Sequence, residues 1–145
     1  MKAFLAGCFV AAALALPAQA QMLITAEEAA LPAAPGGMAL RGVTRGPKVH
    51  LVSPAASGAV VKSPVDLQLK FESFGGSSID PALVKVTYIK SPAVDLTPRL
   101  KDAIKPTGIA MPTAQLPPGD HPIRVEIKDS EGRAGAANFT LKVGN

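Results

Sequence analysis

Cysteine and aromatic residues are scarce in this chain of 145 residues, which contains one cysteine, one tyrosine, five phenylalanines and no tryptophan. One cysteine cannot close an intramolecular disulfide, so packing alone must hold the fold together. Surfaces that bind carbohydrate present exposed rings for stacking. The strand pattern described below turns Phe71, Tyr88 and Phe139 inward and leaves only Phe74 in a loop. The shortage of rings therefore argues against a sugar-binding function.

Long apolar runs are also absent, with one exception at the start of the chain. A largely apolar run extends from Ala3 to Leu16, preceded by Lys2 and ended by Pro17. Ala18-Gln19-Ala20 then supplies the small-x-small pattern that a signal peptidase cleaves. A helix that spans a bilayer needs roughly 20 apolar residues, so we interpret residues 1–20 as a signal peptide cleaved after Ala20. We expect the protein in the periplasm or outside the cell.

A lipoprotein signal is the alternative interpretation, because Leu5-Ala6-Gly7-Cys8 matches a lipobox. A lipobox should close the apolar segment, whereas only four residues precede this one and the apolar run continues after it. We therefore expect the ordinary leader, whose removal takes Cys8 with it. The exported chain, Gln21 to Asn145, then has no thiol and no membrane-spanning segment.

Clustered charge of one sign is missing as well. Without Lys2 the exported chain has 14 basic and 11 acidic side chains, a net charge of +3, and they are scattered singly along the sequence. Binding of nucleic acid calls for a basic stripe, so we expect no nucleic-acid partner. The Gly-x-Ser-x-Gly motif of hydrolases is absent too, and no motif ties a nucleophile to either histidine. We expect no enzymatic activity and no resident cofactor.

Residues 21–46 are rich in Ala, Gly and Pro and show no alternating apolar pattern. Thr25 and Glu28 have the spacing of a capping box, which predicts a helical turn. Pro32 and Pro35 follow closely, and an isolated helix of two turns is marginal in water. We therefore predict a flexible arm with a nascent helical turn. A docking segment that folds on a partner is the alternative.

From Pro47 onward, apolar and polar residues alternate with the period of two that is typical of strands. Side chains two apart share one face of a strand, so each such segment has one face for a core and one for water. Seven strands are predicted in this way, at Lys48–Val52, Ala59–Val61, Val65–Glu72, Val84–Tyr88, Gly108–Leu116, Ile123–Lys128 and Asn138–Val143.

The connections between these strands agree with a two-sheet sandwich. Leu116-Pro117-Pro118-Gly119 and Ser130-Glu131-Gly132 are turn sequences. One insertion is helical, with Thr97 as its cap, Pro98 at the first helical position and the helix extending from Leu100 to Ile104. We predict an all-β, immunoglobulin-like, seven-stranded antiparallel sandwich over residues 47–145, with one short helical insertion.

Several of these segments resemble bacterial periplasmic immunoglobulin-like domains. Within that group they are similar to the CopC family of periplasmic copper carriers, which has an E-set type of sandwich. The resemblance covers most of Pro47 to Val143. The segments that carry it are His50-Leu51-Val52-Ser53-Pro54, Gly58-Ala59-Val60-Val61, Pro64 with the strand to Phe71, Leu116-Pro117-Pro118-Gly119, Asp129-Ser130-Glu131-Gly132 and Phe139-Thr140-Leu141-Lys142-Val143.

The resemblance implies copper carriage as an alternative function. Copper(II) favours imidazole nitrogens, terminal amines and carboxylates. The CopC pattern has one histidine at the mature N-terminus and another just after a late Asp-Gly turn. Here His50 takes the first-strand position but lies far beyond the expected cleavage site, and Gly132-Arg133 occupies the late turn. His50 and His121 are therefore the candidate metal ligands, and copper is the only candidate cofactor.

The turn before the last strand carries two carboxylates, Asp129 and Glu131. A calcium ion takes six to eight oxygen ligands. Two carboxylates without a longer acidic array therefore favour an ordinary charged turn over a calcium site.

The segment from Lys90 to Lys105 interrupts the strand pattern and contains five apolar residues that we propose as partner contacts. These are Val94, Leu96, Pro98, Leu100 and Ile104. Sandwich domains commonly carry recognition on such end loops. The alternative is that the segment only caps one open end of the core. We expect a non-catalytic exported binding or accessory module that contacts another envelope or extracellular protein, with a CopC-type copper carrier as the alternative.

Overall fold

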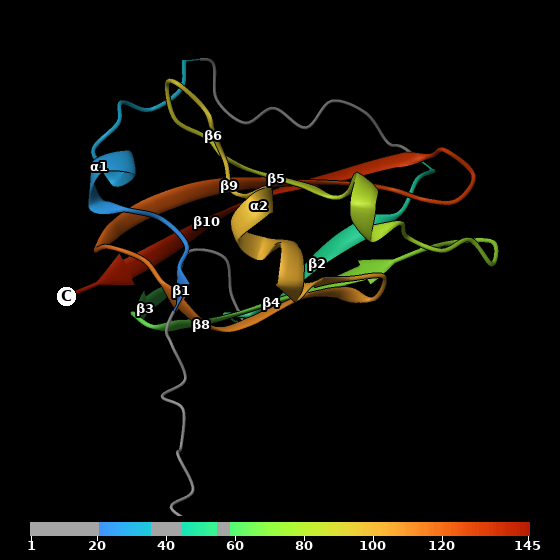
Figure 1. Ribbon diagram of the computed structural model, residues 1–145, viewed down its shortest axis with the longest axis horizontal. Coiled ribbons are helices and arrows are strands. Elements are labelled where there is room, and N and C mark those ends of the chain that lie inside the picture. The colour runs from blue at the N-terminus through green and yellow to red at the C-terminus, as the bar shows by residue number, and fades with distance from the viewer. Residues whose placement is uncertain (1–20, 36–44, 55–58) are drawn as a thin grey trace, which may run out of the picture.

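The computed structural model describes residues 21–35, 45–54 and 59–145 (Figure 1). The signal peptide predicted for residues 1–20 lies outside these ranges. In the described residues the chain forms ten strands and two short α-helices. The strands are β1 (Gln21–Met22), β2 (Lys48–Ser53), β3 (Val60–Lys62), β4 (Val65–Glu72), β5 (Lys85–Tyr88), β6 (Val94–Asp95), β7 (Ile104–Lys105), β8 (Gly108–Gln115), β9 (Gly119–Lys128) and β10 (Ala134–Gly144). The helices are α1 (Ala26–Ala29) and α2 (Thr97–Leu100), and 3₁₀ turns lie at Pro81–Leu83 and Lys101–Ala103.

The strands form two sheets that pack face to face. The first sheet has the order β1-β8-β4-β2, with β7 also paired to β8, and the second has the order β3-β10-β9-β5-β6. In immunoglobulin domains the strands named A, B and E share one sheet and C, F and G the other. Here β2, β4 and β8 take the places of A, B and E, and β5, β9 and β10 those of C, F and G. The prediction of an all-β immunoglobulin-like sandwich with a short helical insertion is confirmed.

All seven predicted strands are present, and three strands of two residues each, β1, β6 and β7, were not predicted. Alternation places the core as expected, most clearly in β4, where every second residue from Val65 to Phe71 is buried. In β9 the buried apolar residues are Ile123, Val125 and Ile127. A single apolar cluster between the sheets therefore holds the described part of the chain together.

Residues 21–35, which we call the strap, pack against the sandwich. Strand β1 pairs in parallel with the end of β8, and Leu23 and Ile24 are each only 1% exposed. The prediction of a flexible arm over residues 21–46 is therefore wrong for the strap, and residues 36–44 lie outside the described ranges. The sequence pattern missed this because two adjacent apolar residues show no periodicity. Burying Leu23 and Ile24 nevertheless removes apolar surface from water, which favours the packed strap.

The helical insertion begins earlier than predicted. Helix α2 covers Thr97–Leu100 and the 3₁₀ turn after it covers Lys101–Ala103, so Thr97 lies inside the helix and does not cap it. The Asp95 carboxylate accepts the Thr97 N–H at 3.0 Å. The Thr97 hydroxyl oxygen accepts the N–H of Val86 in β5 at 2.9 Å. This second bond ties the insertion to the second sheet.

Candidate functional site

The strap lies beside the insertion, so the two segments form one surface. Ser91 donates its N–H to Pro32 O at 3.0 Å, and the Lys90 ammonium donates to Ala29 O at 3.3 Å. An isolated bridge joins Ala33 to Lys90. Figure 1 shows the strap in blue, running from β1 past α1 toward the loop that precedes β6. We call this combined surface, residues 21–35 and 90–105, the strap face.

One carboxylate, that of Glu28, links the two halves of the strap face. The capping box predicted from the sequence is present, since Thr25 accepts the Glu28 N–H at 3.1 Å and Glu28 accepts the Thr25 N–H at 3.0 Å. Arg99 of α2 donates two further bonds to the same carboxylate, at 2.7 and 2.6 Å. Arg99 also donates to Leu23 O at 2.8 Å. The hydrogen bonds from Arg99 are the main reason why the pKa of Glu28 falls to about 2.

The five proposed partner-contact residues divide into core and surface. Leu96 and Leu100 are fully buried, so the prediction that these two contact a partner is wrong. Their apolar side chains close one end of the core, which is the alternative that the sequence left open. Ile104 is 9% exposed and lines the surface hollow described next. Val94 is half-buried, and only Pro98 is exposed.

A surface hollow of about 470 Å³ lies against the exposed side of the insertion. Its lining residues are Pro81, Ala82, Asp95, Thr97, Pro98, Lys101 and Ile104. Four of them are apolar, and Asp95 and Lys101 provide one charge of each sign. The hollow can therefore receive an apolar group flanked by polar contacts, which is the usual chemistry of a small recognition site.

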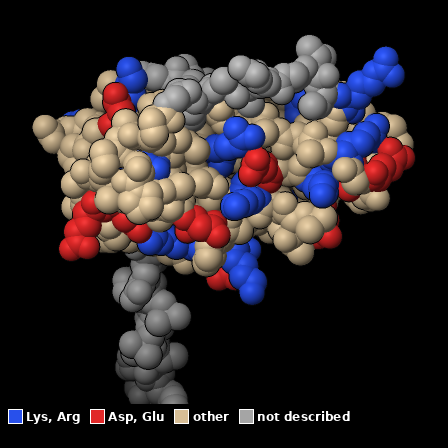
Figure 2. All heavy atoms as spheres, turned by 90° about the horizontal axis from the view of Figure 1, so that it is seen from above, with Lys and Arg blue, Asp and Glu red and all other residues tan. Residues whose placement is uncertain are grey.

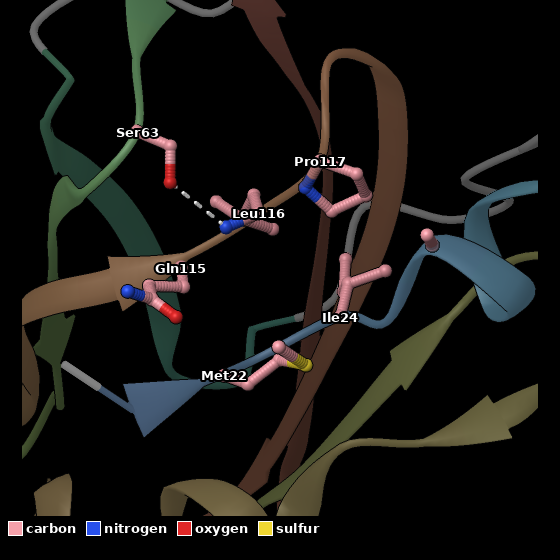
Figure 3. A pocket seen from close by; sticks show the side chains of 7 residues that line it. Met22, Ile24, Ser63, Gln115, Leu116 and Pro117 are labelled. Carbon is pink, nitrogen blue, oxygen red and sulfur yellow. Dashed lines mark hydrogen bonds between the residues drawn. The ribbon is translucent and has the colours of Figure 1, made fainter.

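A smaller hollow of about 240 Å³ lies between the strap and the end of β8 (Figure 3). Met22, Ile24 and Ala26 line it from the strap, and Ser63, Gln115, Leu116 and Pro117 line it from the sandwich. Ser63 accepts the Leu116 N–H at 3.1 Å across one wall. Met22 remains 57% exposed beside it. The strap therefore does not fill all the space next to β8.

His121, one of the two candidate metal ligands, lies in the interior and has both ring nitrogens occupied. Nε2 is 2.6 Å from Pro117 O, and Nδ1 is 3.0 Å from the Tyr88 hydroxyl. A carbonyl oxygen only accepts, so Nε2 carries the proton and Nδ1 accepts the Tyr88 O–H. Burial lowers the pKa of His121 below its usual value. In this arrangement the ring has no free nitrogen for a metal ion.

His50, the other candidate ligand, is on the outer face of β2, where its side chain is 51% exposed. Its Nε2 lies 2.8 Å from an oxygen of Glu72 on the neighbouring strand β4. The two histidines thus occupy an outer face and the interior, and the structure does not bring them together. Across residues 21–35, 45–54 and 59–145, no group of three or more His, Cys, Asp or Glu side chains is arranged to hold a metal ion.

Asp129, considered above as a calcium ligand, is a buried anchor of the β9–β10 turn. Its carboxylate accepts the N–H groups of Glu131 and Arg133, at 3.0 and 2.8 Å. It also accepts the Arg133 guanidinium N–H at 2.8 Å and the Ser77 hydroxyl at 3.3 Å. Four protein donors thus occupy the two carboxylate oxygens, which is the arrangement of a charged turn.

Charged side chains of both signs are mixed on the face seen in Figure 2, where blue and red atoms alternate among uncharged ones. Several of these charges pair on the surface, for example Arg124 with Glu126 at 3.0 Å. Such exposed pairs contribute little to stability. No helix in the part of the chain that the structure describes is long and apolar enough to cross a membrane.

Comparison with known proteins adds a distant likeness among solved structures. No family model matches the chain, and no curated protein sequence matches it. Among solved structures, CopC from Methylosinus trichosporium OB3b is similar at 17% sequence identity and a TM-score of 0.43, over 66% of this chain and 92% of that one. So distant a likeness carries no conclusion about function, and the fold assignment stands on the strand order described above.

The residue that sequence reasoning missed is Arg99. Glu28 was identified through its capping-box spacing, but its partner is 71 positions away along the chain. Local spacing rules describe neighbours within a turn of helix or across a hairpin. They contain no information about an ion pair between two irregular segments.

Proposed function

We propose that this protein is an exported, non-catalytic immunoglobulin-like binding module that contacts another envelope protein through the insertion. The hollow of about 470 Å³ at Pro98 carries the proposal. It lies on an end segment of a sandwich, where such domains commonly place their recognition residues. Its mixture of apolar groups with one acid and one base suits a protein surface.

The insertion is held firmly enough to present that surface in one shape. Leu96 and Leu100 anchor it in the core, and Thr97 bonds to the backbone of β5. Arg99 joins α2 to the strap through its hydrogen bonds to Glu28. A binding surface that is already ordered loses less conformational entropy when a partner binds.

A CopC-type copper carrier is the competing proposal, and it rests on His50. The pair formed by His50 and Glu72 offers one nitrogen and one carboxylate donor on an exposed face. Copper(II) in proteins usually takes a tetragonal set of nitrogen and oxygen ligands. The observed pair is half of such a set, so the binding module is the better-supported function.

The experiment that tests the binding module is site-specific photocrosslinking in intact cells. A photoreactive amino acid replaces Pro98, which lines the hollow, and in a matched control it replaces Val60 of β3, which is 70% exposed. Position 98 should give a discrete adduct with one envelope protein, and position 60 should not. No adduct at position 98, or the same adducts at both positions in folded protein, would contradict the proposal.

A further inference from the structure

The strap adds one strand pair to the edge of a sandwich whose other strand pairs form without it. Every strand pair except β1–β8 is formed by residues after position 45. Only two residues of the strap pair with β8, and α1 is a single turn of four residues, which is marginal as an isolated helix. Departure of the strap would therefore break no pairing among the other nine strands.

The sandwich holds the strap through the edge of β8, two apolar sites and Arg99, which together we call the groove. Each of these parts contacts a different feature of the strap. The edge of β8 offers the Gln115 carbonyl, which accepts the N–H groups of Leu23 at 3.0 Å and Ile24 at 3.4 Å. Two apolar sites bury the side chains of these same residues to 1% exposure. Arg99 then takes the carboxylate of Glu28 with two hydrogen bonds.

The groove also has room that the strap does not use. The hollow of about 240 Å³ in Figure 3 lies between Ala26 and the wall formed by Ser63, Leu116 and Pro117. Ala26 contributes only a methyl group to it, and Met22 stays largely exposed at its margin. A segment with a larger apolar side chain at this position would bury more surface here than the strap does.

We propose that this groove is a segment-binding site in which the strap acts as an exchangeable, autoinhibitory occupant. The external ligand is an extended segment of the envelope partner, with two adjacent apolar residues and an Asp or Glu that follows them at the spacing of Glu28. The inference rests on the proposed binding function and adds to it the chemistry of the partner and the means of control.

The strap competes with such a ligand because it is part of the same chain. Because the chain keeps a tethered segment near its site, the segment competes at an effective concentration of roughly millimolar order. An outside segment must therefore bind more tightly than the strap, or the strap must be weakened first. Charge complementarity selects the ligand, since a partly buried guanidinium without a carboxylate loses its two strongest hydrogen bonds.

The test measures binding of a fluorescent peptide with the sequence of residues 21–35 to the exported protein, by anisotropy. The first variant is Glu28→Gln, which weakens the protein's own strap and leaves Arg99 free for the peptide. The second is Met22→Cys with Gln115→Cys, a pair in direct register that can close a disulfide and lock the strap in place. The exported chain is expected to have no other cysteine.

We expect saturable peptide binding that is about tenfold tighter to Glu28→Gln than to the natural protein. The locked variant should not bind until its disulfide is reduced, and a peptide that itself carries Glu28→Gln should bind about tenfold more weakly. Equal binding to the locked and reduced forms, or no binding to the Glu28→Gln protein at millimolar peptide, would overturn the proposal.

Light scattering on the same proteins tests whether the occupant of the groove is the strap of a second copy of this chain. A concentration-dependent dimer in the natural protein that the disulfide abolishes would mean that straps exchange between copies, and would replace the external ligand. The outcome is independent of photocrosslinking at Pro98. Peptide exchange can fail while the crosslink forms, so failure here is distinguishable from failure of the proposed function.

Discussion

Glu28 joins the strap to the insertion through a carboxylate whose pKa lies near 2, against an ordinary value of 4.5. When pH falls, the unfolded chain takes up a proton at this group before the folded chain does. The contribution of Glu28 to stability is therefore complete above pH 4.5 and is lost between pH 4.5 and 2. This direction follows from the hydrogen bonds that Arg99 donates to the ionised form.

We predict that Glu28→Gln lowers the free energy of unfolding at pH 7 by about 1–2 kcal/mol, because it removes a partly buried bidentate pair. Urea unfolding at pH 7 and pH 3 measures the effect. The difference between natural protein and variant should shrink at pH 3. Glu27→Gln is the matched control, since Glu27 is exposed on the same turn and should change stability by less than about 0.5 kcal/mol. A loss as large in the control would contradict the assignment.

His121 is a second residue whose protonation is coupled to folding. Burial lowers its pKa in the folded state, so the unfolded chain binds a proton first as the pH falls below about 6.5. The stability that the neutral ring contributes is present above that pH and decreases below it. We predict that the natural protein loses thermal stability between pH 7 and 5 for this reason.

His121→Gln tests this prediction by thermal unfolding followed across that pH range. A glutamine amide can donate to Pro117 O and accept from Tyr88, so the variant should fold, at a cost of about 1–2 kcal/mol at pH 7. Its stability should change less between pH 7 and 5 than that of the natural protein. If the variant kept the full pH dependence of the natural protein, the role assigned to His121 would be wrong.

At the scale of elements, the strap is the part of the fold whose contribution is easiest to measure. Leu23 is 1% exposed, so Leu23→Ala leaves a cavity and should lower the free energy of unfolding by about 2–5 kcal/mol. Met22→Ala, next to it and 57% exposed, should cost less than about 0.5 kcal/mol. Urea unfolding compares the two. Similar small losses in both variants would show that the strap is not part of the cooperative fold.

The insertion allows a comparison of the same kind between core and surface residues. Leu100 is fully buried in α2, whereas Pro98 in the same helix is exposed and lines the hollow. Leu100→Ala should destabilise the protein by about 2–5 kcal/mol. Pro98→Ala should have a small effect on stability and should weaken only partner capture. A large loss of stability in Pro98→Ala would show that Pro98 is needed for folding, and would contradict its assignment as a binding residue.

The elements also show which part of the structure could be predicted from the sequence. Strands such as β4 and β9 bury one face, so their alternation fixes both their existence and their inward residues. The strap and α2 are short segments held by contacts with residues distant in the sequence. Leu96 and Leu100 have no periodicity that separates a core cap from an exposed surface, and the Glu28–Arg99 pair depends on the three-dimensional path of the chain. Of the predicted partner surface, Pro98 and Ile104 line the hollow, and Val94 is half-buried.

At the scale of the whole molecule, the sandwich is held by one apolar core between two sheets. The two candidate metal ligands, His121 and His50, differ in burial and in hydrogen-bond partners. His121 is bonded through both ring nitrogens to Tyr88 and Pro117, and His50 stands on an outer face with Glu72. Metal binding at His121 would break a buried hydrogen bond, which costs about 1–3 kcal/mol. This cost opposes any site that uses both histidines.

We therefore predict that calorimetric titration of residues 21–145 with copper(II) shows no submicromolar one-to-one binding. His50 and Glu72 supply two donors, and a tetragonal copper(II) site calls for about four. Weak binding that His50→Ala reduces would be that of an ordinary exposed histidine. Tight stoichiometric binding that disappears in His50→Ala would instead make the protein a divergent metal carrier, because the missing donors would then have to come from a rearranged chain. His121→Gln in the same titration decides whether the buried ring is one of them.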